Sequence, residues 1–358
     1  MDQILERILA DSDVSDLHLE EGSAPWVRSA GALSRIDGQP LTAKQLKDFL
    51  AAHEDETGIA VEQLESRLAK RGDLDFACTV AGARLRGNVF RANGHLCMAL
   101  RRIPRVPADA AVLGLPPRLF SLINRAKGML LVTGPTGSGK STTLAACIEY
   151  LNQHVARHVI TIEDPVEYLF EQRKSLIQQR QVGRDAPSFA AALRAALRED
   201  PDVIMLGELR DTETMETALH AANTGHLVLG TLHTSGARQT IERIGMLFTE
   251  STRANALQSL SSVLIGVISQ CLVPRARGSG RVLSYELMLN TQAVRQAIKD
   301  CKPNAIFSAM ETGRRDGHVL LNQHLADLVR AGEVAKEDAL YITYDPAGLE
   351  KELNYARM

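Results

Sequence analysis

The sequence predicts an α/β protein whose larger, C-terminal part contains a mainly parallel sheet. Short apolar runs alternate there with segments of helical spacing, and neighbouring parallel strands need such connections. A glycine-rich turn follows the first of these runs, and a proline-rich segment precedes the whole region. With 358 residues, 45% of them apolar and 23% charged, the chain is long enough for two domains of ordinary globular composition.

The N-terminal domain is predicted to cover residues 1–105. Strand-like runs alternate there with a helix candidate and with the turn signals Asp37-Gly38 and Asn93-Gly94. Residues 104–117 then contain four prolines and Gly114, and such a segment can continue neither a helix nor a strand. We therefore place a linker at residues 106–117 and the second domain at residues 118–358.

The second domain shows the alternation most clearly. Short runs rich in Ile, Val and Leu predict buried strands at residues 129–133, 158–162, 203–206 and 227–231. Apolar residues at helical spacing lie between these runs, in two groups: Leu144, Cys147, Ile148 and Leu151, and then Phe189, Ala192, Leu193, Ala196 and Leu197. Helices between strands predict a parallel sheet with both faces covered.

The glycine-rich turn has the pattern of a phosphate-binding P-loop, G-x-x-x-x-G-K-S. It lies between a strand and a helix, where backbone N–H groups and the helix dipole favour a bound anion. Lys140 adds a charge for the β- and γ-phosphates, and the Ser141 hydroxyl is a ligand for Mg²⁺. The full motif disfavours a turn without a ligand. We therefore predict that Mg²⁺ binds at Ser141 and that ATP binds at Gly134, Pro135, Thr136, Gly137, Ser138, Gly139, Lys140, Ser141 and Thr142.

Acidic residues follow two of the predicted strands. Glu163 and Asp164 come after the second strand, and Glu208 comes after the third. The carboxyl ends of parallel strands meet at one edge of the sheet, where α/β proteins bind ligands. Each acid taken alone would be a solvated loop residue, but together they are candidates for binding Mg²⁺ and positioning water.

Two histidines bracket the fourth strand. Imidazole titrates near neutral pH and can bond a phosphate oxygen, so His226 and His233 are further candidates. A purely structural role stays open for both residues. It is the weaker interpretation for His233, which follows the carboxyl end of the strand.

Residues 76–108 contain arginines but no acidic residue. Such a segment predicts a local positive face that binds phosphate or nucleic acid, or one that is merely solvated. In a ring-shaped assembly, one of these side chains could reach a neighbour's nucleotide. The arginines are Arg84, Arg86, Arg91, Arg101, Arg102 and Arg105.

The remaining composition predicts a cytoplasmic protein. The net charge of −2 gives no general reason to expect nucleic acid as a partner. Five scattered cysteines without a C-x-x-C pair favour reduced thiols over a zinc module. The most apolar stretch, residues 257–273, is interrupted by polar residues that include Ser269 and Gln270, and the chain start lacks the pattern of a secretory signal.

Four motifs in one order carry a family resemblance: GPTGSGKST at 134, TIEDPVEY at 161, PDVIMLGELRDTET at 201 and TGHLVLGTLHTSGA at 224. The chain resembles the type IV pilus retraction ATPases of the secretion (traffic) ATPase superfamily. The resemblance implies an N-terminal PAS-like α+β domain, carried by SDLHLEEGSAPWVRSAGAL from Ser15, and a C-terminal RecA-like P-loop ATPase domain with a helical C-terminal region.

The same resemblance implies roles for the candidate residues. Residues 134–142 correspond to the Walker A motif, and Glu163 and Asp164 to the Asp box, which with Ser141 would serve Mg²⁺. The Walker B box ends at Glu208, which would polarise the attacking water. Lys140, Glu163 and Glu208 are thereby candidate catalytic residues.

His226 and His233 correspond to the His box of the family. Its N-terminal arginines correspond to Arg86, within RGNVF, and Arg101, within LRRIP. The implied assembly is a homo-hexamer with the nucleotide between N- and C-terminal domains. It would hydrolyse ATP to drive pilus retraction and twitching motility, at the cytoplasmic face of the inner membrane and with a membrane platform protein as partner.

One segment departs from the family pattern. The retraction ATPases carry an AIRNLI segment where residues 293–298 read AVRQAI, so Gln296 and Ala297 replace Asn and Leu. The missing four-cysteine zinc module weighs against the extension and type II secretion ATPases.

Three alternatives remain open. A related traffic ATPase could serve conjugation or secretion. A RecA-like nucleic-acid motor is disfavoured by the near-neutral charge and by an aromatic content of 4%. A nucleotide-dependent scaffold without turnover is disfavoured by the presence of Glu208.

Overall fold

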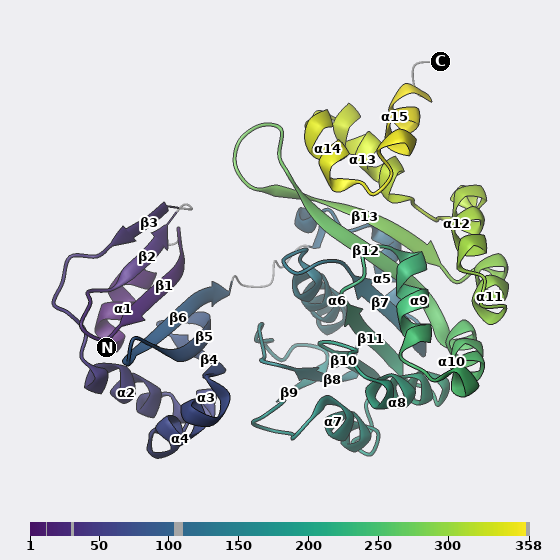
Figure 1. Ribbon diagram of the computed structural model, residues 1–358. Coiled ribbons are helices and arrows are strands. Elements are labelled where there is room, and N and C mark those ends of the chain that lie inside the picture. Colours follow the sequence, from purple (N-terminus) through teal and green to yellow (C-terminus); the bar gives the residue numbers. More distant parts are fainter. Residues whose placement is uncertain (12, 30–31, 104–109, 356–358) are drawn as a thin grey trace. The chain divides into compact units, whose positions relative to one another are not determined.

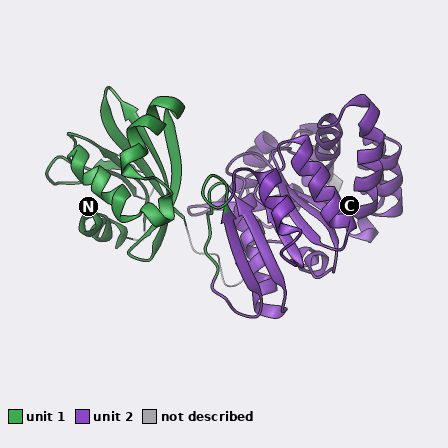
Figure 2. Cartoon of the chain, turned by 90° about the horizontal axis from the view of Figure 1, so that it is seen from below, with its two compact units in different colours: residues 1–105, 164–170, 181–185 green, residues 106–163, 171–180, 186–358 purple. Residues whose placement is uncertain are grey.

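The computed structural model describes residues 1–11, 13–29, 32–103 and 110–355, in two compact units (Figure 2). Unit 1 comprises residues 1–105 with two later segments, 164–170 and 181–185, and unit 2 comprises residues 106–163, 171–180 and 186–358. No sequence signal indicates that the two later segments belong to unit 1. Of the expected linker, residues 106–109 lie outside the described residues.

Unit 1 contains a six-stranded antiparallel sheet in the order β3-β2-β1-β6-β5-β4 (Figure 1). The central pair, β1 with β6, joins the first three strands to the last three. The strands are β1 (Val14–Glu20), β2 (Trp26–Ser29), β3 (Ala32–Arg35), β4 (Asp73–Val80), β5 (Ala83–Ala92) and β6 (His95–Ile103).

Helices α1 (Asp2–Leu9), α2 (Ala43–Ala52), α3 (Glu54–Thr57) and α4 (Val61–Arg71) complete unit 1. Their apolar side chains, such as Phe49, share one buried cluster with strand residues such as Leu17 and Phe76. Residues that alternate with these along the strands point to the other face of the sheet. The expected α+β architecture of the N-terminal domain is confirmed.

Unit 2 is built on a seven-stranded sheet in the order β13-β12-β7-β11-β10-β8-β9. Strands β12, β7, β11, β10 and β8 pair in parallel, and β13 is antiparallel to β12. The mainly parallel sheet is thus confirmed. The strands are β7 (Gly128–Thr133), β8 (His158–Glu163), β9 (Leu176–Gln181), β10 (Val203–Leu206), β11 (Leu227–Leu232), β12 (Leu264–Pro274) and β13 (Arg281–Leu289).

Every residue of β7, β10 and β11 is buried, so helices and loops cover both faces of this sheet. None of the helices in the described part of the chain is long and apolar enough to cross a membrane. The helices of unit 2 are α5 (Pro117–Ile123), α6 (Lys140–His154), α7 (Phe189–Ala196), α8 (Thr212–Asn223), α9 (Ala237–Met246), α10 (Glu250–Val263), α11 (Gln292–Lys299), α12 (Pro303–Thr312), α13 (Leu321–Arg330), α14 (Lys336–Ile342) and α15 (Pro346–Tyr355).

The last three helices form a small core of their own around the outer ends of β12 and β13 (Figure 1). Two histidines bind α13 and the segment before it to β13. Nδ1 of His318, which precedes α13, accepts from Leu289 N–H at 3.1 Å, and Nδ1 of His324 on α13 accepts from Tyr285 N–H at 3.4 Å. Burial lowers the pKa of both imidazoles, which agrees with their role as neutral acceptors. The region is therefore docked on the sheet by directed hydrogen bonds as well as by apolar packing.

Candidate active site

The P-loop turns sharply between the end of β7 and the start of α6. Gly134, Gly137 and Gly139 have φ values of 145°, 77° and 87°, a region that side chains rarely enter. A Cβ at Gly134 would also lie only 2.3 Å from the carbonyl oxygen of Gln270. The N-terminus of α6 has no side-chain cap, so its N–H groups are available to an anion.

A buried amide on β12 clamps the two sides of this loop. Gln270 is 3% exposed; its Nε2 donates to Ser138 O at 2.7 Å and its Oε1 accepts from Thr143 Oγ1 at 2.9 Å. In the sequence Gln270 only interrupts an apolar stretch, and nothing there links it to a loop more than 100 residues earlier. Strand pairing of β12 with β7 brings the two together.

Two further features of the loop, a buried hydroxyl and a lysine ammonium group, suit a phosphate ligand. The hydroxyl of Ser138 is buried without a hydrogen-bond partner among the described residues. Lys140 is 9% exposed, and its Nζ donates to Gly134 O at 2.8 Å and to Pro135 O at 3.1 Å, so the ammonium group lies over the loop. Donors gathered around one concave backbone segment are the chemistry that binds phosphate oxygens.

His233 lies between Lys140 and Glu208. Its Nδ1 is 3.5 Å from Lys140 Nζ, and its Nε2 is 3.3 Å from Glu208 Oε1. With Nδ1 accepting from the ammonium group, Nε2 carries the proton and donates to the carboxylate. The structure thus brings together three residues predicted from separate motifs, each following a different strand of the sheet.

Arg210 completes the surroundings of Glu208, with Nη2 at 2.7 Å from Oε2. Partial burial opposes ionisation of Glu208, but the hydrogen bond and charge of Arg210, together with His233, outweigh it and hold the pKa of this carboxyl below its usual value. Glu208 is therefore a carboxylate at neutral pH. Arg210 is not among the residues predicted from the sequence, although it lies two residues after a predicted catalytic acid.

Glu163 is the last residue of β8 and is 7% exposed. One carboxylate oxygen accepts from Thr161 Oγ1 at 2.6 Å and from Gln179 Nε2 at 3.1 Å. Asp164 belongs to unit 1, whereas Glu163 belongs to unit 2. No group of three or more His, Cys, Asp or Glu residues that could hold a metal by itself occurs in the described ranges, so phosphate and hydroxyl oxygens would have to contribute to a cation site.

His226 lies at the opposite end of β11 from His233. Its ring Nδ1 is 3.0 Å from Ala221 O, and its backbone N–H donates to the same oxygen at 3.1 Å, so the residue closes the end of α8. Because β11 runs parallel to β7, this end is the edge of the sheet remote from the P-loop. Within one chain, the structure does not bring His226 to the candidate site.

The expected positive face of residues 76–108 is largely neutralised by acids from other segments. Arg84 pairs with Glu56 at 2.6 Å, and Arg91 pairs with Glu65 at 2.7 Å. Glu56 lies on α3 and Glu65 lies on α4, both of which precede the arginines in the chain. The sequence of residues 76–108 alone therefore gives no sign of these ion pairs. Arg105 lies outside the described residues.

Arg86 and Arg101 are cross-strand partners on β5 and β6 and therefore share one face of the unit 1 sheet. Arg86 pairs with Glu167 at 3.0 Å, within unit 1. Arg101 pairs with Asp16 at 2.7 Å, yet its side chain stays 71% exposed. An ion pair this open holds its partners weakly, so the guanidinium groups can take other anionic partners.

The chain matches the family model described as type II/IV secretion system protein over residues 66–341. It is similar to the type IV pilus retraction ATPase PilT of Pseudomonas aeruginosa, with 41% identity over 92% of this chain and 94% of the relative. Among solved structures it is similar to the pilus retraction motor PilT with bound ADP, with a TM-score of 0.87, 43% identity and coverage of 98% of this chain and 99% of the other. The ATPase DotB of Legionella pneumophila is similar with a TM-score of 0.76 and 29% identity, covering 96% and 94%.

We expect Gln270→Leu to lower the affinity for ATP about tenfold, because it leaves the Ser138 carbonyl and the Thr143 hydroxyl unpaired inside the fold. Calorimetric titration with ATP measures the loss, and the melting temperature reports folding. Gln270→Glu retains an acceptor for Thr143 but has no donor for Ser138, so it tests the same clamp with little change in shape.

Gln292→Leu is the matched control, because that side chain is exposed at the start of α11. An affinity equal to wild type in both Gln270 variants, with the fold retained, would show that the clamp does not hold the loop.

Proposed function

The chain belongs to the type II/IV secretion system protein family, and from this premise we propose that it is an ATP-hydrolysing motor that powers the retraction of type IV pili. The contact of His233 with both Lys140 and Glu208 beside the P-loop carries the chemical part of the proposal. Similarity to PilT over nearly the whole length of both chains supports the biological part.

Hydrolysis needs the phosphates held, the water oriented and the developing charge balanced. Backbone N–H groups at the start of α6 hold the phosphates, and Lys140 turns from the loop carbonyls to the β- and γ-phosphate oxygens. Glu208, ionised at neutral pH, accepts a hydrogen bond from the attacking water and orients it. His233 contacts both Lys140 and Glu208. A movement of Lys140 towards the terminal phosphate therefore changes the position of the His233 ring, and with it the position of Glu208.

The residues present fit a magnesium ion bound together with ATP. Ser141, exposed at the second position of α6, offers a hydroxyl ligand, and Glu163 and Asp164 offer carboxylate oxygens for bound water. Mg²⁺ bound with ATP supplies positive charge to the phosphate oxygens.

We place the active form in a homo-hexameric ring in which Arg86 and Arg101 of one subunit reach the nucleotide of a neighbour. Their shared sheet face and the exposure of Arg101 favour this role over a structural one within unit 1. The ring works at the cytoplasmic face of the inner membrane through a membrane platform protein of the pilus, without direct contact with nucleic acid.

The segment that departs from the family pattern lies in α11. Val294, Ala297 and Ile298 are buried, with Ala297 6% exposed, whereas Arg295 and Gln296 face outward. The change from Leu to Ala therefore alters packing inside the helical layer, and the change from Asn to Gln alters a surface position. A changed surface residue alters what a partner protein can contact. For this reason a related role in conjugation or secretion is the second candidate function.

Glu208→Gln is expected to lower phosphate release about 100-fold or more, since the amide keeps the shape but loses the charge that orients water. Binding of ATP with Mg²⁺ should persist, whereas Lys140→Ala should weaken the binding itself. Glu216→Gln, on the exposed side of α8, is the matched control. Normal turnover of the Glu208 variant at saturating ATP would remove this carboxylate from the mechanism.

The ring predicts recovery of activity in mixtures. Subunits with Arg101→Ala and subunits with Glu208→Gln are each expected to hydrolyse ATP poorly, but mixed rings contain some sites with an intact arginine from one subunit and an intact carboxylate from the other. Phosphate release by the mixture should exceed that of either variant alone. Mixtures no more active than the variants, or monomers in light scattering at active concentrations, would contradict the arrangement.

Deletion of the gene is expected to give cells with excess surface pili and no twitching motility. The wild-type gene should restore both properties, and Lys140→Ala should restore neither, because nucleotide binding is lost. Electron microscopy of pili and a motility assay measure the outcome. Bald cells would indicate extension of pili, and normal pili with lost DNA transfer would indicate a conjugative role.

A further inference from the structure

A buried carboxylate links the loop that carries His233 to the C-terminal helices. Glu286 lies on β13 and is 4% exposed. Its Oε1 accepts from the backbone N–H of Ala237 at 2.7 Å, and its Oε2 accepts from the hydroxyl of Tyr344 at 2.7 Å. Neither the P-loop chemistry nor the packing of the sheet requires a carboxyl side chain at this place.

The contact with Ala237 places a carboxyl oxygen at the beginning of α9. Ala237 is the first residue of that helix, and the preceding Gly236 provides no side-chain cap. The carboxylate of Glu286 takes that capping role and lies at the positive end of the helix dipole. Burial raises the pKa of Glu286, and hydrogen bonds from Ala237, Tyr344 and the backbone of Leu321 oppose that rise.

The beginning of α9 also fixes the loop that follows His233. Thr240 is fully buried on α9; its Oγ1 donates to Gly236 O at 2.7 Å and lies 2.6 Å from Thr234 Oγ1. Residues 234–237 are therefore bound to the first turn of the helix. A shift of that turn moves the backbone next to His233, whose ring contacts Lys140 and Glu208.

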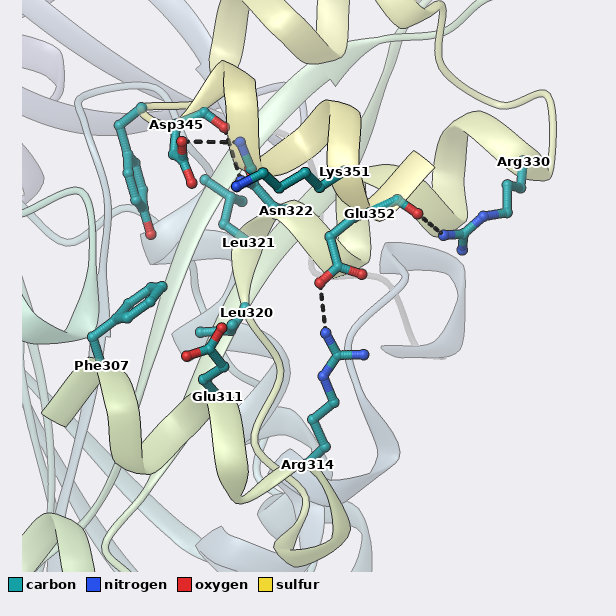
Figure 3. Close-up of a pocket in the computed structure, with 12 residues that line it drawn as sticks. Phe307, Glu311, Arg314, Leu320, Leu321, Asn322, Arg330, Asp345, Lys351 and Glu352 are labelled. Carbon is teal, nitrogen blue, oxygen red and sulfur yellow. Dashed lines mark hydrogen bonds and ion pairs between the residues drawn. The ribbon is translucent and has the colours of Figure 1, made fainter. Parts of the chain in front are cut away.

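Tyr344 lies at the corner between α14 and α15. Its neighbour Thr343 donates to Asn322 on α13, and the amide of Asn322 donates to Asp345 O at 2.9 Å (Figure 3). Tyr344 also lines a cavity of about 710 Å³ between α12, α13 and α15 and is 49% exposed. The position of its hydroxyl thus depends on how the C-terminal helices are placed.

We propose that Glu286 is a positioning residue for ATP hydrolysis, which transmits the placement of the C-terminal helices from Tyr344 to the loop of His233. This inference rests on the proposed ATPase function. Glu286 bonds to Ala237 and Tyr344 rather than to the phosphate-binding backbone, so we expect the link to change the rate of turnover more than the affinity for ATP. A motor needs such a link, since work done by one part of the chain must depend on the state of the nucleotide site.

Tyr344→Phe in the full chain is the test, since it removes only the donor to Glu286. A buried carboxylate that loses one of its donors moves or takes up a proton, and the cap of α9 weakens. We expect kcat for ATP to fall about tenfold, with KM for ATP within about twofold of wild type. Tyr341→Phe is the matched control, because Tyr341 is 89% exposed on α14 and does not line the cavity beside Tyr344.

A second variant separates the link from a general loss of structure. In Glu286→Gln the amide oxygen can still accept from Ala237, and its NH₂ group can donate to the Tyr344 oxygen, so kcat should fall less than in Tyr344→Phe. The double variant should be no slower than Tyr344→Phe, because both changes act on one link.

Three results would overturn the inference: an unchanged kcat in Tyr344→Phe, a rise in KM with constant kcat, or losses that multiply in the double variant. Turnover by the wild-type chain is the reference for the proposed function. If the wild-type chain hydrolyses no ATP, hydrolysis itself is contradicted and the link with it, whereas equal rates in wild type and Tyr344→Phe contradict the link alone.

Discussion

The arrangement of the site depends on one histidine ring that contacts two oppositely charged groups. Lys140 begins α6, Glu208 follows β10, and His233 follows β11, so the contact requires the parallel register of β7, β11 and β10. That register follows from fully buried strands whose side chains pack against helices on both faces. Anything that displaces one of these strands along its axis separates Lys140 from Glu208.

Two buried polar side chains support this arrangement from β12, which pairs with β7, and from its neighbour β13. Gln270 fixes the P-loop through Ser138 and Thr143, and Glu286 fixes the beginning of α9. Burying either side chain costs free energy, and hydrogen bonds offset that cost. Hydrogen bonds depend on direction, so these two side chains fix the orientation of the segments that they contact, which apolar packing alone does not. Tyr344, between the last two helices of the chain, donates a hydrogen bond to Glu286.

Local patterns in the sequence predicted much of this molecule. The four predicted strands are present with at most one extra residue each, and the motif residues Lys140, Glu208 and His233 meet as their places at strand ends predict. Contacts between distant segments could not be predicted in this way. Gln270 and Glu286 depend on pairing of β12 and β13, and the acids that neutralise Arg84 and Arg91 come from helical segments earlier in the chain.

The central claim is that hydrolysis by Glu208 drives the withdrawal of pili. Its most direct test is to label pili fluorescently in living cells and to count retraction events when Glu208→Gln is the only copy of the gene. We expect that pili still extend and that retraction events are lost or become rare. Retraction at the wild-type frequency, with the variant protein present at normal level, would contradict it.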